Sequence, residues 1–347
     1  MRIVKAWDRF WFEPRETLTL GVIRALAGFL VLSYALLISG YVQTWFTNSG
    51  LVSSQTAQAY DGPYHFSLLL IWPSATAVWI VFGLLIVFSI SMMLGFFSRL
   101  SCILVYICLL SFDHRDLIIL NSGDTMLKLL TFYLCLSPCE ASFSLDAVIR
   151  RRQRRERPNL VSALLNNLTY GASGPVAAPW ALRLIQIQVS VVYISTVLSK
   201  LPGPMWQNGS ALWNVYNLSE MMRFPLPSLF HSPFMINAAS WGTLLIEFSM
   251  AVLVWFPGTR LFALLLGALL HLGIEYSMNV PLFSAIMLTA YLSFLDLSIL
   301  WRRFLSTPWA HKLKLAAASE SSKAPGEPLE GREAPVPRQR SRSGRRR

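Results

Sequence analysis

The sequence predicts an all-α membrane protein, a polytopic bundle of about eight transmembrane helices with both termini in the cytoplasm. Hydrophobic residues make up 54% of the chain and charged residues only 14%, whereas soluble domains carry roughly 25% charged residues. The apolar residues form runs long enough to cross a bilayer, and the basic residues cluster beside these runs. These observations exclude a soluble globular domain.

Eight apolar runs approach the roughly 20 residues that the hydrocarbon core of a bilayer requires. The fourth is short and close to the third, so this pair is a candidate for a tilted or re-entrant arrangement. The runs leave no room for a soluble domain, and we expect one transmembrane domain over residues 1–303. In chain order they are residues 18–40, 74–94, 100–119, 125–137, 181–198, 240–256, 260–278 and 282–300.

Arginine clusters predict the orientation of the bundle, because the loops on the cytoplasmic side of a membrane protein carry the excess of Lys and Arg. With these clusters inside, segment 41–66, which has no Lys or Arg, lies outside. Both termini are then cytoplasmic, in an integral protein of the cell membrane. The clustered residues are Arg150, Arg151, Arg152, Arg154, Arg155, Arg157, Arg302, Arg303, Arg338, Arg340, Arg342, Arg345, Arg346 and Arg347.

The C-terminal segment, residues 304–347, is rich in Ala, Ser, Pro, Glu and Arg and has no apolar periodicity. Such a composition predicts a disordered cytoplasmic tail. The net charge of +12 is compatible with nucleic-acid binding or with contact to anionic lipid. Because the basic residues lie beside the spans, we expect anionic lipid at the tail and no nucleic-acid partner.

Several charged residues lie inside the predicted spans, where each costs roughly 2.5–3.5 kcal/mol at mid-bilayer. Arg24 lies in the first span, Glu247 in the sixth and Asp296 in the eighth. Such groups are expected to face the interior of the bundle and to find partners. We therefore expect Arg24 to form a structural ion pair with Asp296 or Glu247.

A second set of polar residues lies in the outer half of the predicted bundle. His271, Glu275 and Asn279 recur every four residues and share one stripe of the seventh span. Asp124 and Lys128 form a pair with the same spacing in the fourth span. These groups predict an outward-facing polar pocket, and the alternative is a set of helix contacts satisfied within the protein.

Lys200 follows the fifth apolar run and precedes the sequence Leu-Pro-Gly-Pro-Met-Trp. An amine at the end of an apolar helix is partly removed from water, which disfavours its ammonium form and suits it to act as a base. Lysines at helix ends also reach the membrane interface and serve as anchors. Both roles remain open from the sequence of this segment.

The sequence contains no pattern of a soluble enzyme or of a metal site. There is no Gly-Lys-Ser/Thr phosphate loop, no His-Glu-x-x-His and no Gly-x-Ser-x-Gly. The four cysteines lack the paired spacing of zinc ligands and are expected to be small apolar residues. No metal is therefore predicted.

Four segments of the chain resemble the HTTM family, the membrane domain shared with vitamin K-dependent gamma-carboxylase. They are LGVIRALAGFL at 20–30, YISTVLSKL at 193–201 with WQNGSAL at 206–212, Glu247, and HLGIEYSMNVPLF at 271–283. The resemblance spans residues 1–303. It implies that Lys200 matches the carboxylase lysine that deprotonates reduced vitamin K, a hydroquinone.

The resemblance has two gaps. The carboxylase has a histidine in the segment that corresponds to 121–124, and this chain has none there. The large extramembrane domain of the carboxylase is also missing. These gaps weaken the case for glutamate carboxylation and leave quinol deprotonation open.

Two functional hypotheses follow from different classes of protein. The first is a quinol-dependent, carboxylase-like enzyme or oxidoreductase, with Lys200 as base and His271 and Glu275 as further catalytic candidates. Its cofactor or substrate would be a reduced quinone. The alternative is a non-enzymatic membrane protein similar to SdpB-like proteins, which aids the maturation or export of a secreted peptide.

Overall fold

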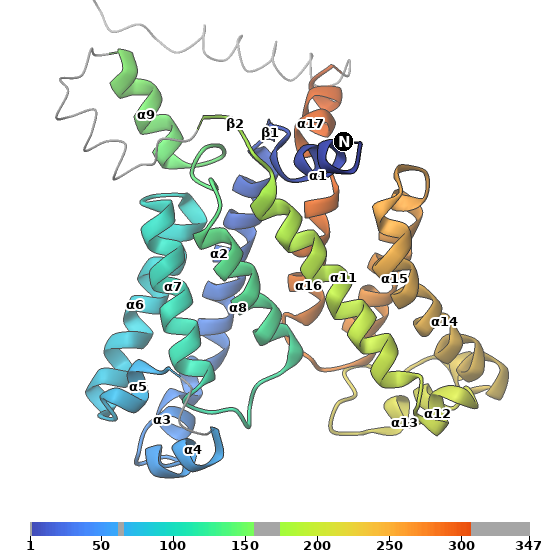
Figure 1. Ribbon diagram of the computed structural model, residues 1–347. Coiled ribbons are helices and arrows are strands. Elements are labelled where there is room, and N and C mark those ends of the chain that lie inside the picture. Colours follow the sequence, from blue (N-terminus) through green and yellow to red (C-terminus); the bar gives the residue numbers. More distant parts are fainter. Residues whose placement is uncertain (1, 62–65, 156–173, 307–347) are drawn as a thin grey trace, which may run out of the picture. The chain divides into compact units, whose positions relative to one another are not determined.

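The computed structural model describes residues 2–61, 66–155 and 174–306. The chain divides into two units, residues 1–298 and 299–347, and the helices of the first unit carry the site (Figure 1). The predicted tail, 304–347, lies almost wholly outside the described residues. The long helices are α2 (Leu18–Ile38), α6 (Ala75–Leu94), α7 (Ser98–Asp113), α8 (Ser122–Cys135), α11 (Trp180–Lys200), α14 (Pro233–Val252), α15 (Pro257–Ser277) and α16 (Phe283–Tyr291).

Short elements precede, connect and follow these helices. The one sheet of the described residues has two antiparallel strands of two residues each, β1 (Arg15–Glu16) and β2 (Val176–Ala177). The other elements are α1 (Arg2–Phe12), η1 (Ser39–Tyr41), α3 (Val42–Phe46), α4 (Ser54–Asp61), α5 (Leu68–Ile71), α9 (Leu145–Arg155), α12 (Pro204–Gln207), α13 (Ala211–Asn217), η2 (Ser228–His231), η3 (Leu253–Trp255), η4 (Leu292–Phe294) and α17 (Leu297–Leu305).

Helix α2 packs against α6, α8 and α16, and α11 packs against α8, α14 and α16. The contact of α2 with α6 is close because Gly28 has no side chain. A Cβ atom added there would lie 2.5 Å from the Met93 backbone nitrogen. Small residues at such contacts are typical of membrane helices, whose association depends on close packing. We name the end of this unit opposite α1, where α11 ends and α14 begins, the distal end.

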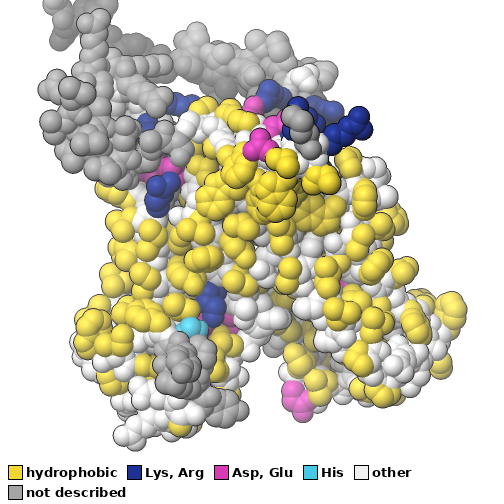
Figure 2. Space-filling model, in the orientation of Figure 1, with side chains coloured by type: hydrophobic (Ala, Val, Ile, Leu, Met, Phe, Trp, Pro, Cys, Tyr) yellow, Lys and Arg dark blue, Asp and Glu magenta, His cyan; other side chains and the backbone are white. Residues whose placement is uncertain are grey.

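Large apolar side chains cover the flanks of the bundle (Figure 2). On α15, for example, Leu261, Leu265 and Leu269 are each at least 60% exposed. A continuous apolar exterior of this extent is stable only in contact with lipid, since soluble proteins rarely expose patches of more than a few hundred Å². The backbone polar groups of such segments are satisfied inside the helices.

Five helical segments are long and apolar enough to cross a membrane, and a bent pair, Phe283–Phe294 with Leu297–Phe304, would be a sixth. The prediction of an all-α multi-pass membrane protein is therefore confirmed, whereas the count of eight spans stays a prediction. The five segments are Leu18–Phe46, Ala75–Leu94, Trp180–Lys200, Pro233–Trp255 and Pro257–Ser277.

Two predicted spans are shorter in the structure than in the sequence pattern. The third ends at Asp113, because the following residues form an irregular connection to α8. The eighth is interrupted after η4, where Leu295 is extended and Asp296 Oδ1 accepts a hydrogen bond from the backbone N–H of Ser298. Polar residues lie at both breaks, residues 113–116 at the end of α7 and Asp296 after η4, but the apolar residues that follow them extended the predicted runs across the breaks.

The predicted orientation can be tested with reporter fusions. A reporter after Arg347 is expected to lie in the cytoplasm and one inserted in α4 outside, because the arginine clusters outweigh the other loop charges. Enzymatic reporters that are active on only one side of the membrane provide the measurement. The reverse assignment at either position would contradict the predicted topology.

Replacement of Gly95 tests the close packing around Arg24. Gly95 ends α6 in a left-handed conformation with φ of 71°, and an added Cβ would lie 2.7 Å from Arg24 Nη1. We expect Gly95→Ala to lower the free energy of unfolding by about 1–3 kcal/mol, from backbone strain and overpacking. Thermal unfolding in detergent is the measurement. Gly83→Ala is the control, since its Cβ would meet nothing within 4 Å, and an equal loss in both variants would refute the expectation.

Candidate functional site

Lys200 is the last residue of α11, at the distal end of the bundle. The helix stops there because Pro202 and Pro204 cannot supply backbone donors, and the N–H of Gly203 instead bonds to the Lys200 carbonyl at 2.9 Å. Gly203 lets the chain turn back closely, since an added Cβ would lie 3.1 Å from that carbonyl oxygen. The turn brings α12 over the lysine side chain.

The Lys200 ammonium forms an ion pair and hydrogen bond with Oε1 of Glu247, in α14. Its Nζ also lies 4.9 Å from the centroid of the Trp206 ring, which is a cation–π contact. The Lys200 side chain is 24% exposed and that of Glu247 is 8% exposed. The second carboxylate oxygen, Oε2, is buried and has no hydrogen bond of good geometry from the described residues, and the Thr196 hydroxyl is a nearby donor. The lysine is therefore accessible at an edge, while its partner is enclosed.

His271 belongs to a buried group of aromatic hydrogen-bonding side chains. Its Nε2 lies 2.7 Å from the hydroxyl of Tyr193, which in turn hydrogen bonds to the hydroxyl of Tyr291. These three side chains come from α11, α15 and α16 and are at most 4% exposed. Nδ1 of His271 is buried without a hydrogen-bond partner in the described part of the chain. The carboxylate of Glu247 interacts electrostatically with the hydroxyl groups of Tyr193 and Tyr291, so the aromatic group lies close to the Lys200–Glu247 ion pair.

The stripe predicted on α15 does not converge on one interior pocket. Glu275 forms an ion pair with Arg223 and is 39% exposed, whereas His271, one turn earlier, is buried. Beyond Glu275, the backbone N–H of Asn279 bonds to the carbonyl of Met221. The end of α15 packs against this connection rather than against other long helices, so the shared stripe does not give a shared environment.

The predicted Asp124–Lys128 pair is also replaced by other partners. Asp124 accepts a hydrogen bond from the backbone N–H of Asn121 and completes a capping box at the start of α8. Lys128 instead forms an ion pair of 2.8 Å with Asp113, whose side chain is 2% exposed. The last residue of α7 thus supplies the buried carboxylate, and no spacing along the chain pointed to it.

Arg24 does not pair with an acidic side chain of the described residues, contrary to the prediction. Its guanidinium is fully buried and donates to the carbonyls of Met92, Met93 and Phe143. Glu247, one of its two expected partners, is bonded to Lys200 instead. Carbonyl groups at the ends of helices carry partial negative charge and can take the place of a carboxylate. Arg24 therefore joins α2 to the end of α6 and to the connection before α9.

Two cavities lie at the distal end. The larger, about 320 Å³, is lined mainly by aromatic and aliphatic side chains and by Asp124. This volume lies near the lower limit of roughly 300–1,000 Å³ for ligand pockets. Lys200 and Glu247 do not line it. The lining residues are Tyr34, Leu37, Ile38, Tyr41, Trp45, Phe46, Ile119, Asn121, Asp124, Pro281 and Leu282.

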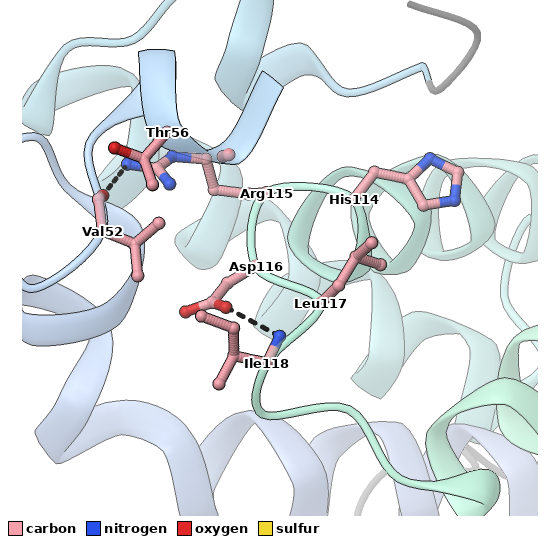
Figure 3. Close-up of a pocket in the computed structure, with 8 residues that line it drawn as sticks. Val52, Thr56, His114, Arg115, Asp116, Leu117 and Ile118 are labelled. Carbon is pink, nitrogen blue, oxygen red and sulfur yellow. Dashed lines mark hydrogen bonds between the residues drawn. The ribbon is translucent and has the colours of Figure 1, made fainter. Parts of the chain in front are cut away.

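The smaller cavity, about 30 Å³, lies between α4 and the connection from α7 to α8 (Figure 3). Arg115 donates to the Val52 carbonyl at 2.8 Å, and the His114 side chain points away from this bond. Burial raises the pKa of the Asp116 carboxyl, although the Ile118 N–H and the charge of Arg115 oppose that rise. The volume suits a water molecule and is too small for a cofactor.

Metal binding has no support in the part of the chain that the structure describes, where no group of three His, Cys, Asp or Glu side chains could hold an ion.

The geometry leaves the Lys200–Glu247 pair and the Tyr193–Tyr291–His271 group as the functional candidates. Tyr193 precedes Lys200 by two helical turns, a spacing that places both on one face of α11. That spacing is the signal that sequence reasoning missed.

The apolar exterior, the long helices and the buried charged groups define a multi-pass integral membrane protein. A family model described as the HTTM domain matches residues 12–299, and the chain belongs to the HTTM family. This match covers both the Lys200–Glu247 pair and His271. Comparisons with curated proteins and with solved structures give no match.

Proposed function

We propose that this protein is a quinol-dependent enzyme of the cell membrane in which Lys200 is the base. The observation that carries the proposal is the Lys200–Glu247 pair, where an accessible amine is bonded to one oxygen of an enclosed carboxylate. The other oxygen, Oε2, has no hydrogen bond of good geometry among the described residues, although the Thr196 hydroxyl acts on the same carboxylate. A buried carboxylate oxygen without a full donor requires an explanation, and acceptance of a proton is the one that we propose.

The two residues of the pair have different parts in proton transfer, with Lys200 as the base toward the substrate and Glu247 as the acceptor of the lysine proton. Lys200 must first lose a proton, and Glu247 is the adjacent group that can accept it. The neutral amine can then take a proton from a substrate hydroxyl, which leaves Lys200 as the ammonium and the substrate as the anion. A reduced quinone would supply such a hydroxyl, and its deprotonation makes the ring reactive toward oxygen.

The surroundings of Lys200 suit an apolar aromatic substrate. The lysine is partly exposed at the distal end of an apolar helix, so a lipid-soluble ring has access to it from the bilayer. Trp206, beside the amine, offers an aromatic face against which a ring can stack. Glu275 is left out of this proposal, because it is bonded to Arg223 on the surface.

Quinol turnover and bound quinone together test the proposal. Protein purified in mild detergent is expected to yield a quinone on solvent extraction and mass spectrometry. It is also expected to consume reduced vitamin K-type naphthoquinol in the presence of oxygen faster than detergent micelles alone. Absence of bound quinone together with no turnover would overturn the proposal.

A non-enzymatic role in the maturation or export of a secreted peptide is the second candidate. It is favoured by one observation, which is that the cavity of about 320 Å³ is not lined by Lys200. The ion pair would then join α11 to α14 without taking part in chemistry. Recovery of a co-purified peptide, with peptide secretion unchanged in Lys200→Arg, would support this role against the enzymatic one.

A further inference from the structure

Helix α1 has the composition of a helix that lies in a membrane interface. It carries basic residues on one face and large apolar residues on the other, and none of its residues is buried. Ile3 is 85% exposed and Trp7 is 64% exposed. Amphipathic helices with Lys and Arg on the polar face and Trp or Phe on the other bind in the headgroup region. The exposed apolar face therefore fits acyl chains.

The C-terminal end of α1 is held on the bundle by Arg183, which contacts Phe10 on the same apolar face as Ile3 and Trp7. The Arg183 guanidinium donates through Nε to the Phe10 carbonyl at 3.2 Å and lies 4.5 Å from the centroid of the Phe10 ring. That ring in turn lies 6.0 Å from the ring of Trp255, just before α15. Arg260 donates through Nε to the carbonyl of Val254 at 3.1 Å. Two arginines thus flank the same aromatic contact.

Arg15, in β1, pairs with Ala177 of β2, which lies just before α11, and so Arg15 lies at the same end of α11 as Arg183. Arg15 and Arg260 both act on Arg183 as repelling charges, and Arg15 acts on Arg260 in the same way. Glu13, an exposed residue, offsets this repulsion only in part at Arg183. None of the ion pairs among residues 2–61, 66–155 and 174–306 includes any of the three. The arginines donate instead to uncharged acceptors, Arg183 to Oε1 of Gln186 and Arg260 to the carbonyls of Val254 and Trp255, so the cluster of three guanidinium groups keeps most of its positive charge.

The surrounding structure adds to this positive potential. Arg183 lies in the first turn of α11 and Arg260 in the first turn of α15, where the helix dipole also favours an anion. At the end of the molecule where Figure 1 shows α1, Figure 2 shows a concentration of Lys and Arg side chains with Asp and Glu side chains among them. Planar guanidinium groups match the geometry of phosphate oxygens.

From these observations we infer that Arg15, Arg183 and Arg260 form a binding site for the phosphate of an anionic phospholipid, whose acyl chains pack against the exposed apolar face of α1. The occupant is a lipid of the leaflet next to α1. Its headgroup neutralises the arginine cluster, and its chains cover Ile3 and Trp7. This site is separate from the Lys200–Glu247 pair, which lies at the distal end.

Lipid binding by the detergent-solubilised full chain tests the inference. Native mass spectrometry is carried out with added phosphatidylglycerol, with phosphatidylcholine and with inorganic phosphate. We expect phosphatidylglycerol to bind at least about tenfold more tightly than phosphatidylcholine. The double variant Arg15→Gln/Arg260→Gln should lose about 25-fold in this binding, since each basic group near an anionic headgroup contributes roughly fivefold. Inorganic phosphate alone should bind weakly.

A matched variant removes the same charge elsewhere. Arg99→Gln/Arg223→Gln also deletes two arginines, but both have carboxylate partners, Glu140 and Glu275. This control should keep its preference for phosphatidylglycerol. Equal binding of the two lipids, or an equal loss in both double variants, would overturn the inference. Tight binding of inorganic phosphate without lipid would overturn the lipid assignment. If the double variant does not fold, Arg15→Gln alone, at an exposed residue, should still lower binding about fivefold.

Discussion

Lys200→Arg is expected to abolish quinol turnover while the protein stays folded. Arginine keeps the positive charge and can still bond to Glu247, but it does not release its proton near neutral pH. Loss of a general base typically lowers the rate by a factor of roughly 10²–10⁴. The measurement pairs turnover of reduced naphthoquinol with folded yield and thermal stability in the same detergent.

Two further variants make the result specific to proton transfer. Glu247→Gln retains a hydrogen-bond acceptor but cannot take the lysine proton, so turnover should fall while the protein remains folded. Arg223→Lys exchanges the cation of the exposed pair with Glu275 and should leave turnover unchanged. Full turnover in Lys200→Arg would reduce Lys200 to an ion-pair partner and interfacial anchor.

Arg24→Met is expected to cause a larger loss of stability than Gly95→Ala or any change at Lys200. The substitution removes the Arg24 donor from the carbonyls of Met92, Met93 and Phe143, and of these Met92 still accepts from the N–H of Gly95 at 3.2 Å. Each buried carbonyl left unsatisfied costs about 1–3 kcal/mol. We therefore expect a decrease of about 3 kcal/mol or more in the free energy of unfolding, seen as a low folded yield and a lower unfolding temperature.

The control for Arg24→Met is Leu26→Met, which changes an exposed apolar residue of the same helix. A swap between Leu and Met of similar volume usually costs less than about 1.5 kcal/mol. An unchanged unfolding temperature in Arg24→Met would mean that the carbonyl contacts add nothing to stability. Overpacking against Arg24 would then no longer account for a loss of stability in Gly95→Ala.

The long helices were predictable because a bilayer imposes a simple requirement on sequence. A segment that crosses it must be apolar for roughly 20 residues and must satisfy its own backbone, and α2, α6 and α11 follow the pattern closely. The ends of α7 and α16 were not predictable in the same way. Apolar residues continue beyond both ends, and the positions of the breaks depend on local capping and on connections packed against other helices.

Partners of the charged residues were the weakest part of the sequence prediction. Spacing along one helix suggested Asp124 with Lys128, and depth in the predicted spans suggested Arg24 with Asp296 or Glu247. The structure bonds Lys128 to Asp113 and Glu247 to Lys200, in both cases across two helices. Contacts between helices depend on rotation and tilt, which a hydropathy pattern does not specify.

The amino-acid sequence by itself determined the class of protein, the identity of the buried charges and the choice of Lys200 as a candidate base, because these follow from composition, span length and motif order. The tertiary structure alone decided which acid bonds to Lys200, which carbonyls hold Arg24 and which arginines gather beside α1. The physical reason is that hydrophobicity is a property of each segment, whereas an ion pair or a binding site requires side chains from separate segments to meet at a few ångströms. The packing of the helices determines which of these side chains come into contact.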